Sequence, residues 1–165
     1  MVVVPFTNGV VILPHASDRV RDARLLADRL LSEHGLHDWS FVFNRRKNCM
    51  GYCSFDTRTI ELSIHFVERN AMDQVRDTLL HEIAHALVGP GHGHDAVWKR
   101  KCLEVGARPE RCGQADMPAG DWQARCKSCG KVYHRHRRPR PLRGWYCPPC
   151  GADHGKLNWK CDAAN

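Results

Sequence analysis

The stretch that decides the fold is residues 79–98, which read LLHEIAHALVGPGHGHDAVW. It contains His81-Glu82-x-x-His85, and two residues four apart on a helix lie on the same face. His81 and His85 can therefore both offer ring nitrogens to one Zn²⁺ ion at about 2.0–2.1 Å. Glu82 lies about 100° further round the helix, where it can reach a metal-bound water without being a ligand. The pattern predicts a helix with two metal ligands and a general base.

The third metal ligand is expected after this helix, because a catalytic zinc takes three protein ligands and keeps one position open. The Gly-Pro pair at residues 89–90 ends the helix, since glycine suits the C-terminal cap and proline cannot continue a helix. His92 and His94 both follow this break. We favour His94, because residues 95–106 read as a new helix that places Trp98 one turn beyond it. His92 is the alternative ligand.

A chance occurrence of the motif is the competing interpretation, since the chain has 11 histidines. The helical context, the Gly-Pro break and the histidine that follows all favour a metal site. A remnant that still binds metal but no longer catalyses a reaction is a further alternative.

The composition is typical of a cytoplasmic globular protein. The 165 residues suit one domain, or one domain with a small appendage, and 42% hydrophobic residues can form a core. The apolar start MVVVPF lacks the basic segment and cleavage site of a signal peptide, and no apolar run approaches the ~20 residues of a membrane span. Without an export signal, nine cysteines predict thiols and zinc thiolates rather than disulfides. We expect a cytoplasmic protein, with association with the nucleoid as an option.

The positive charge is concentrated at the C-terminal end of the chain. Residues 122–165 hold ten Lys or Arg and two Asp or Glu, which gives +8, whereas the rest of the chain sums to −1. Such asymmetry indicates an attached segment that binds a polyanion, and a merely solvated tail is the alternative.

The remaining sequence predicts an α+β fold around the motif. A helix from Ser17 or Asp18, as its cap, to His34 has apolar residues at the three-and-four spacing of one buried face. The motif helix is expected over residues 71–88, with Asn70 as its N-cap. Strands are expected at residues 39–43, 51–55 and 59–63, the last two as a hairpin, and residues 10–13 read as a short strand or an N-terminal anchor. The expected domain has a small antiparallel sheet and an active-site helix.

A basic turn at residues 44–48 precedes the hairpin, and two cysteines four residues apart follow it. A strand would point Cys49 and Cys53 to one face, but no partner ligands are evident, so we expect buried thiols rather than a metal site. Residues 108–120 are rich in proline and glycine and read as a linker. We therefore divide the chain into one domain at residues 1–120 and a second at residues 121–165.

The C-terminal domain carries a second candidate metal site, built from two Cys-x-x-Cys pairs. Cys126 and Cys129 are separated by 17 residues from Cys147 and Cys150, and a glycine follows each pair. This spacing is typical of a four-cysteine structural zinc site, and the glycines allow the tight turn that brings two sulfurs onto one metal. A redox dithiol is the alternative, which the matched pair disfavours. The segment is too poor in apolar residues to fold alone, so the metal would supply its stability.

Between the two cysteine pairs lies a basic loop that contains prolines and is flanked by aromatic residues. The prolines keep it out of a helix, and arginines on an extended loop can pair with phosphates. The aromatics can stack on unpaired bases, or they can form the small core of the ribbon itself. We expect binding to nucleic acid, DNA in the first place, without sequence specificity, because nothing here resembles a recognition helix. The candidate contacts are Lys131, Tyr133, Arg135, Arg137, Arg138, Arg140, Arg143 and Trp145.

The chain resembles the SprT-like (Spartan-like) family of zinc metalloproteases, of the bacterial or phage type with a C-terminal zinc ribbon. The resemblance rests on residues 58–63 (RTIELS), on the His-Glu-x-x-His motif, on His94-x-x-x-Trp98 and on the four-cysteine ribbon. It implies a zincin-like fold. The functional residues that it implies are His81, His85 and His94 as zinc ligands and Glu82 as the catalytic base. One departure is Asp95, since the family usually has glycine directly after its third histidine.

The expected function is that of a zinc-dependent endopeptidase with two zinc ions per chain, one catalytic and one structural. The resemblance implies that its substrates are proteins bound or crosslinked to DNA. The alternative is a non-catalytic, zinc-binding adaptor for nucleic acid, such as a transcription or replication accessory protein. A third hypothesis keeps the enzyme but makes its substrate unrelated to DNA. We expect no membrane partner.

Overall fold

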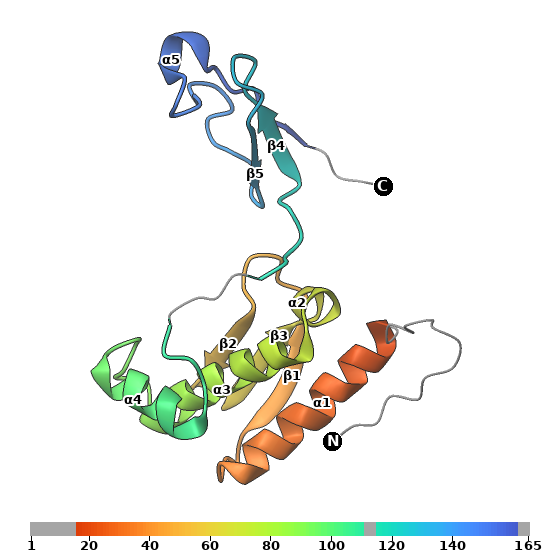
Figure 1. Ribbon diagram of the computed structural model, residues 1–165, viewed down its shortest axis with the longest axis vertical. Coiled ribbons are helices and arrows are strands. Elements are labelled where there is room, and N and C mark those ends of the chain that lie inside the picture. The colour runs from red at the N-terminus through yellow and green to blue at the C-terminus, as the bar shows by residue number, and fades with distance from the viewer. Residues whose placement is uncertain (1–15, 111–114, 162–165) are drawn as a thin grey trace, which may run out of the picture.

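Helices and short strands are both present, and the α+β class is confirmed. The computed structural model describes residues 16–110 and 115–161, so the strand or anchor predicted at residues 10–13 lies outside the described residues. The elements in chain order are α1 (Ala16–Glu33), β1 (Ser40–Asn44), β2 (Gly51–Ser54), β3 (Thr59–Ser63), α2 (Ile64–Arg69), α3 (Met72–Val88), α4 (Ala96–Val105), β4 (Trp122–Arg125), β5 (Val132–Arg135), α5 (Gly151–His154) and β6 (Lys160–Cys161) (Figure 1). In these two described ranges, no helix combines the length and apolarity needed to cross a membrane.

The first unit of the fold is a three-stranded sheet against which two long helices pack. The strand order is β1-β3-β2, and β3 takes the centre because its residues are buried on both faces of the sheet. β2 and β3 form the predicted antiparallel hairpin, but β1 runs parallel to β3, so the sheet is mixed rather than wholly antiparallel. α1 and α3 lie side by side against this sheet (Figure 1). Fully buried members of the shared core include Leu30, Ile60, Leu62, Leu79 and Ile83, each of which contributes about 1.5–3 kcal/mol by its burial.

The helix starts differ from the prediction by one or two residues. α1 begins at Ala16, so the caps predicted at Ser17 or Asp18 fall inside its first turn, where the acidic Asp18 still complements the helix dipole. α2 was not predicted at all. It has six residues directly after β3, which is too short for a periodic pattern to reveal.

The prediction that Asn70 caps α3 is wrong. Asn70 instead anchors the segment that follows α4. The N-cap of α3 is the next residue, Ala71. The Asn70 side chain, 4% exposed, donates to the carbonyl oxygens of Phe66 and Asp116 and accepts from the Asp116 N–H, each at 2.8 Å. Because a buried amide needs such partners, this clamp holds residues 115–117 against the main core. Part of the predicted linker therefore packs as a piece of the first unit.

The break between α3 and α4 follows the expected chemistry of helix ends. Gly89, with φ +87°, ends α3. Asp95 is the N-cap of α4, and its carboxylate accepts the Trp98 N–H at 2.9 Å. Gly106, in the left-handed conformation with φ +80°, ends α4. The helix predicted over residues 95–106 is confirmed, with its first and last residues as caps.

The second unit, residues 121–161, is a small antiparallel sheet with its own core, and we call it the ribbon. Its strand order is β5-β4-β6. The buried members of its core are Ala124, Cys126, Cys147, Leu157 and Trp159. Figure 1 shows the ribbon standing apart from the first unit, at the end of the chain segment that precedes β4. Each of the two predicted domains thus has a separate hydrophobic cluster.

Candidate metal centres and catalytic cleft

Three histidine side chains converge on one point near the C-terminal end of α3. His81 Nε2 lies 3.1 Å and His85 Nε2 lies 3.3 Å from His94 Nε2. Three imidazoles bound tetrahedrally to one Zn²⁺ at about 2.0–2.1 Å would have their nitrogens about 3.3 Å apart. The three nitrogens therefore have the separation of a three-histidine metal site, and they fit this ion well.

The alternative ligand, His92, lies outside this cluster. Its Nδ1 is 2.8 Å from Asp95 Oδ2. The other oxygen of the same carboxylate caps α4. Asp95 therefore holds both the start of α4 and the His92 side chain in place. The fold brings His94, and not His92, together with the two histidines of α3.

A buried tryptophan forms the floor of the histidine cluster. Trp98 is 0% exposed, and its ring centroid lies 4.6 Å from that of His81, 5.1 Å from that of His85 and 4.5 Å from that of His94. Rings packed on one indole are restricted before any metal binds, which preorganises the ligands. Burial lowers the pKa of His81 and His85 to about 4, so both are neutral near pH 7, in the form that binds metal.

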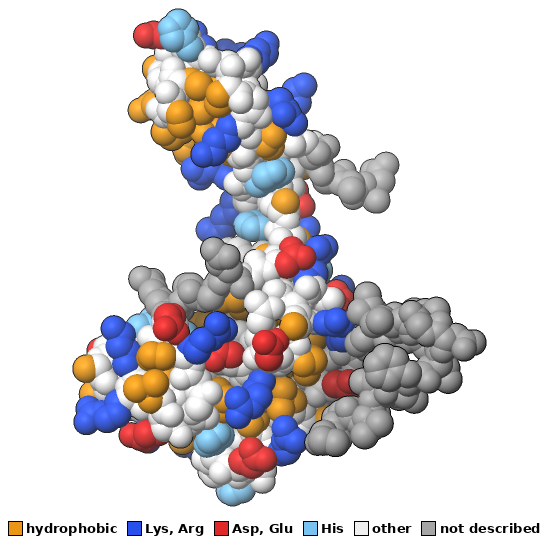
Figure 2. All heavy atoms as spheres, in the orientation of Figure 1, with side chains coloured by type: hydrophobic (Ala, Val, Ile, Leu, Met, Phe, Trp, Pro, Cys, Tyr) orange, Lys and Arg blue, Asp and Glu red, His pale blue; other side chains and the backbone are white. Residues whose placement is uncertain are grey.

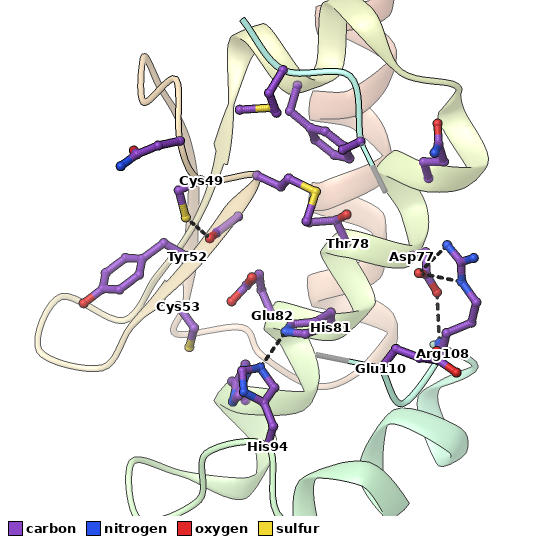
Figure 3. A pocket seen from close by; sticks show the side chains of 18 of the residues that line it. Cys49, Tyr52, Cys53, Asp77, Thr78, His81, Glu82, His94, Arg108 and Glu110 are labelled. Carbon is purple, nitrogen blue, oxygen red and sulfur yellow. Dashed lines mark hydrogen bonds and ion pairs between the residues drawn. The ribbon is translucent and has the colours of Figure 1, made fainter. Parts of the chain in front are cut away.

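Glu82 lies beside the histidines and points from α3 toward β2 (Figure 3). Its side chain is 8% exposed, and burial raises the pKa of its carboxyl to about 8. The facing residue on β2 is Gly51, where a Cβ would lie 2.8 Å from Glu82 Oε1, 2.9 Å from Glu82 Cγ and 3.0 Å from Thr78 Cγ2. Glu82 thus occupies the space that a side chain at Gly51 would need. No local sequence pattern indicates this role of Gly51, because only the fold brings β2 against α3.

Glu82 and the three histidines line an open cleft of about 870 Å³ between α3 and β2 (Figure 3). The segment after α4 contributes Arg108 and Met117 to this cleft, and the ribbon contributes His136. Arg108 is held by Asp77 of α3, whose carboxylate accepts its backbone N–H at 2.9 Å and its Nε–H at 3.0 Å. No local pattern in the sequence marks these residues, since they reach the cleft only through tertiary packing.

Cys49 and Cys53 lie on the β2 side of the same cleft, and neither joins a metal-ligand cluster among the described residues. Cys53 is buried, and burial raises its pKa to about 12. Cys49 is half-buried, its thiol donates to the Gly51 carbonyl at 2.8 Å, and burial raises its pKa as well. Both are therefore neutral thiols near pH 7, as the sequence analysis expected.

The four ribbon cysteines converge as closely as the histidines do. The sulfurs of Cys126, Cys129, Cys147 and Cys150 all lie within 4.8 Å of one another, and those of Cys129 and Cys147 are 3.6 Å apart. Four thiolates bound tetrahedrally to Zn²⁺ at about 2.3 Å would have their sulfurs about 3.8 Å apart. Gly130 and Gly151, with φ +75° and +70°, make the two tight turns that the sequence predicted. These residues fit a structural zinc ion.

The candidate nucleic-acid contacts fall into two groups. Five of them have partners inside the ribbon. The Arg135 guanidinium lies 4.2 Å from the Trp145 ring centroid, and the Tyr133 hydroxyl donates to Cys147 Sγ at 3.0 Å. Lys131 Nζ lies 5.5 Å from the Tyr133 ring centroid and the Arg138 guanidinium 5.7 Å from that of Trp122. Tyr133 and Trp145 also pack on the ribbon core, which is the alternative that the sequence left open. The other three, Arg137, Arg140 and Arg143, are exposed and have no ion-pair partner among the described residues. Figure 2 shows Lys and Arg side chains spread over the ribbon.

A helix that carries two histidines and a glutamate, a third histidine from the following loop and an open cleft together define the site of a metalloprotease. The model of the SprT-like family matches residues 21–117, more than half of the chain, and the chain belongs to this family. No curated protein matches it. Among solved structures, the metallopeptidase zymogen jannalysin of Methanocaldococcus jannaschii is similar, with a TM-score of 0.46 and 18% identity over 50% of this chain and 80% of that chain.

Proposed function

We propose that the protein is a zinc-dependent endopeptidase that cleaves proteins bound to or crosslinked with DNA. The observation that carries the proposal is the convergence of three imidazole nitrogens beside a buried carboxylate in an open cleft. His81, His85 and His94 would hold the catalytic zinc, and Cys126, Cys129, Cys147 and Cys150 would hold a structural zinc.

The proposed chemistry divides between the metal and Glu82. A zinc ion at the three histidines would supply a Lewis acid that activates a water and polarises a peptide carbonyl. Glu82 would take the proton from the attacking water and pass it to the leaving amine. The neighbouring cation would favour the charged form of Glu82, opposing the effect of burial on its pKa. His81 and His85, neutral near pH 7, would need no deprotonation before they bind the metal.

The state of Glu82 supports a catalytic rather than a purely structural site. Glu82 is 8% exposed and lines the cleft, and among the described residues no hydrogen bond or ion pair engages its carboxylate. Placing a carboxylate in this largely buried position costs free energy, as its raised pKa indicates, whereas an apolar side chain would pack there without this cost. A proton-transfer role explains the carboxylate, and the alternative of a non-catalytic adaptor does not.

The edge of the sheet supports an extended peptide as the substrate. β2 is an outer strand in the order β1-β3-β2, and it lines the cleft. Within the described part of the chain, β2 pairs only with β3, so its outer edge is open apart from the Gly51 carbonyl, which accepts the Cys49 thiol. An extended peptide that pairs with such an edge gains main-chain hydrogen bonds whatever its sequence. This arrangement suits an endopeptidase with broad specificity.

The charge of the ribbon supports DNA as the partner that brings substrates to the cleft. Its exposed loop arginines have no ion-pair partner within the described residues, and such cations gain free energy by displacing counterions from phosphates. A protein bound to the same DNA would then be held at high effective concentration near the cleft. Binding of this kind needs no sequence-specific contact.

The proposal is tested with Glu82→Gln and with a ribbon variant that replaces Arg137, Arg138, Arg140 and Arg143 by alanine. Glu82→Gln should lower proteolysis by about 100-fold or more, while zinc content stays at two per chain. The ribbon variant should lose stimulation by DNA but keep zinc and DNA-independent cleavage of an unfolded protein. Full activity of Glu82→Gln in a clean preparation would contradict the mechanism. Equal activity of the wild type with and without DNA would favour a substrate unrelated to DNA.

A further inference from the structure

The basic turn that joins β1 to β2 has no part in the site described so far. It carries three consecutive cations, Arg45, Arg46 and Lys47. Two hydrogen bonds hold its backbone: the Arg46 N–H donates to Asn44 Oδ1 at 3.0 Å, and Ser63 Oγ donates to the Arg46 carbonyl at 2.6 Å. The cations therefore project from a backbone that is tied down on both sides of Arg46.

This turn lies where the cleft meets the ribbon. Lys47 Nζ is 2.9 Å from Asp121 Oδ1, at the entrance to β4. Lys47 and His136, which follows β5, both line the cleft. Gly120 lies directly against the backbone of Arg135, where a Cβ would come within 2.1 Å of its carbonyl carbon. The turn, the base of the ribbon loop and the cleft thus share one rim.

Basic residues outnumber acidic residues in the ribbon that borders this rim. The ribbon has ten Lys or Arg, and its described part has two acids, Asp121 and Asp153. Lys47 already neutralises Asp121. Arg45 is exposed and has no ion-pair partner among the described residues. Like charges gathered in this way repel one another until a polyanion neutralises them, so the rim fits a polyanion.

Arg46 lies over an aromatic ring at the cleft, with part of the edge of its guanidinium open to solvent. Its guanidinium carbon lies 4.8 Å from the centroid of the Tyr52 ring, which is 45% exposed and lines the cleft. The guanidinium also hydrogen-bonds the Cys49 thiol, and its remaining N–H groups lie at the edge of the stack, where they can bind an anion. Its acidic neighbour Glu61 is 4.0 Å away, at the limit of an ion pair, and the same Glu61 oxygen accepts a hydrogen bond from the Asn44 amide at 2.8 Å.

We propose that Arg45 and Arg46 bind the phosphate backbone of the nucleic acid that the ribbon loop holds. The polyanion then crosses the rim of the cleft instead of ending at the ribbon. This assignment rests on the proposed function, since it extends the path of the same nucleic acid. It gives the first unit a phosphate contact that the sequence analysis did not include.

The test measures binding of a duplex DNA to the full-length, zinc-loaded protein at two salt concentrations. Each phosphate contact on duplex DNA contributes about 0.9 to the slope of log affinity against log salt. The ratio of affinities at about 50 and 200 mM salt should therefore fall about 3.5-fold in Arg45→Ala and about 12-fold in Arg45→Ala/Arg46→Ala. Zinc content and melting temperature should match the wild type.

The matched control is Arg29→Ala, which removes one exposed arginine from the last turns of α1. That end of α1 leads into the start of β1. The basic turn follows the opposite end of β1, about 16 Å away, because β1 has five residues. The control should keep the wild-type ratio. If Arg45→Ala behaves like Arg29→Ala while Arg137→Ala/Arg138→Ala weakens binding, the turn is not a contact and the proposed function stands. If the wild type binds no DNA, both proposals fail.

Discussion

Replacing Gly51 by alanine tests the position of Glu82 without changing a metal ligand. Gly51 lies in β2 and its φ is outside the left-handed region, so the backbone accepts alanine without strain. The new Cβ would lie 2.8 Å from Glu82 Oε1, about 0.6 Å short of ordinary contact, which begins at 3.4 Å. Because Glu82 Cγ would also lie only 2.9 Å from it, the whole side chain of Glu82, and not its tip alone, must shift by a similar distance.

The expected effect on catalysis follows from that displacement. A misplacement of about 1 Å costs roughly 100-fold in rate, so about 0.6 Å should lower kcat about 10- to 20-fold. Because no zinc ligand moves directly, zinc content should be unchanged. Overpacking of this kind also destabilises by about 1–3 kcal/mol, which a urea titration measures.

The assay compares kcat for cleavage of an unfolded protein by the wild type, Gly51→Ala and Gly91→Ala. Gly91 is the matched control, because a Cβ there meets nothing within 4 Å and its φ is not left-handed. It should keep wild-type activity and stability. A Gly51→Ala enzyme with unchanged kcat and full zinc content would refute the reasoning, since Glu82 would then have room to move or would not be the base.

Three further predictions concern the two metal sites and the Asn70 clamp. Trp98→Phe should weaken zinc binding at the histidines about 10-fold, because the three imidazoles lose their shared floor; chelator competition measures this, and unchanged affinity would contradict the role. Removal of zinc with a strong chelator should unfold the ribbon but leave the first unit folded, as followed by NMR, because only the ribbon lacks a large core. Asn70→Ala should destabilise the protein by about 2–4 kcal/mol in urea, from three lost hydrogen bonds of about 0.5–1.5 kcal/mol each. It should also expose the segment around Asp116 to proteolysis, and a stable, protected variant would show that the clamp is dispensable.

Much of the fold could be predicted because its signals are local. Helix periodicity and the Gly-Pro break at residues 89–90 located α3 and α4, and the spacing of the cysteines located the ribbon. The third histidine could also be chosen, since a new helix after His94 carries Trp98 back under the cluster. Asp95, which departs from the family pattern, proves to be the cap of that helix. Each of these features depends on residues close together in the sequence.

The remaining features depend on contacts between distant residues, and no local pattern indicates them. The parallel pairing of β1 with β3 follows from the burial of β3 on both faces, which requires a second neighbour. Asn70 reads as a helix cap because asparagine favours caps, but its amide finds two backbone partners in Asp116, 46 residues away. The glycine at position 51 likewise gains its meaning only from Glu82 on another element.

The anchored segment at residues 115–117 affects how the two units could be exchanged during evolution. It packs on the main core, lines the cleft through Met117 and coincides with the end of the family match. The protease module therefore ends beyond α4, at a wall made of chain that has no regular secondary structure. A lineage could lose or replace its ribbon after Gly120 and keep the cleft closed on that side. A deletion that began at residue 108 would instead remove the wall along with the ribbon.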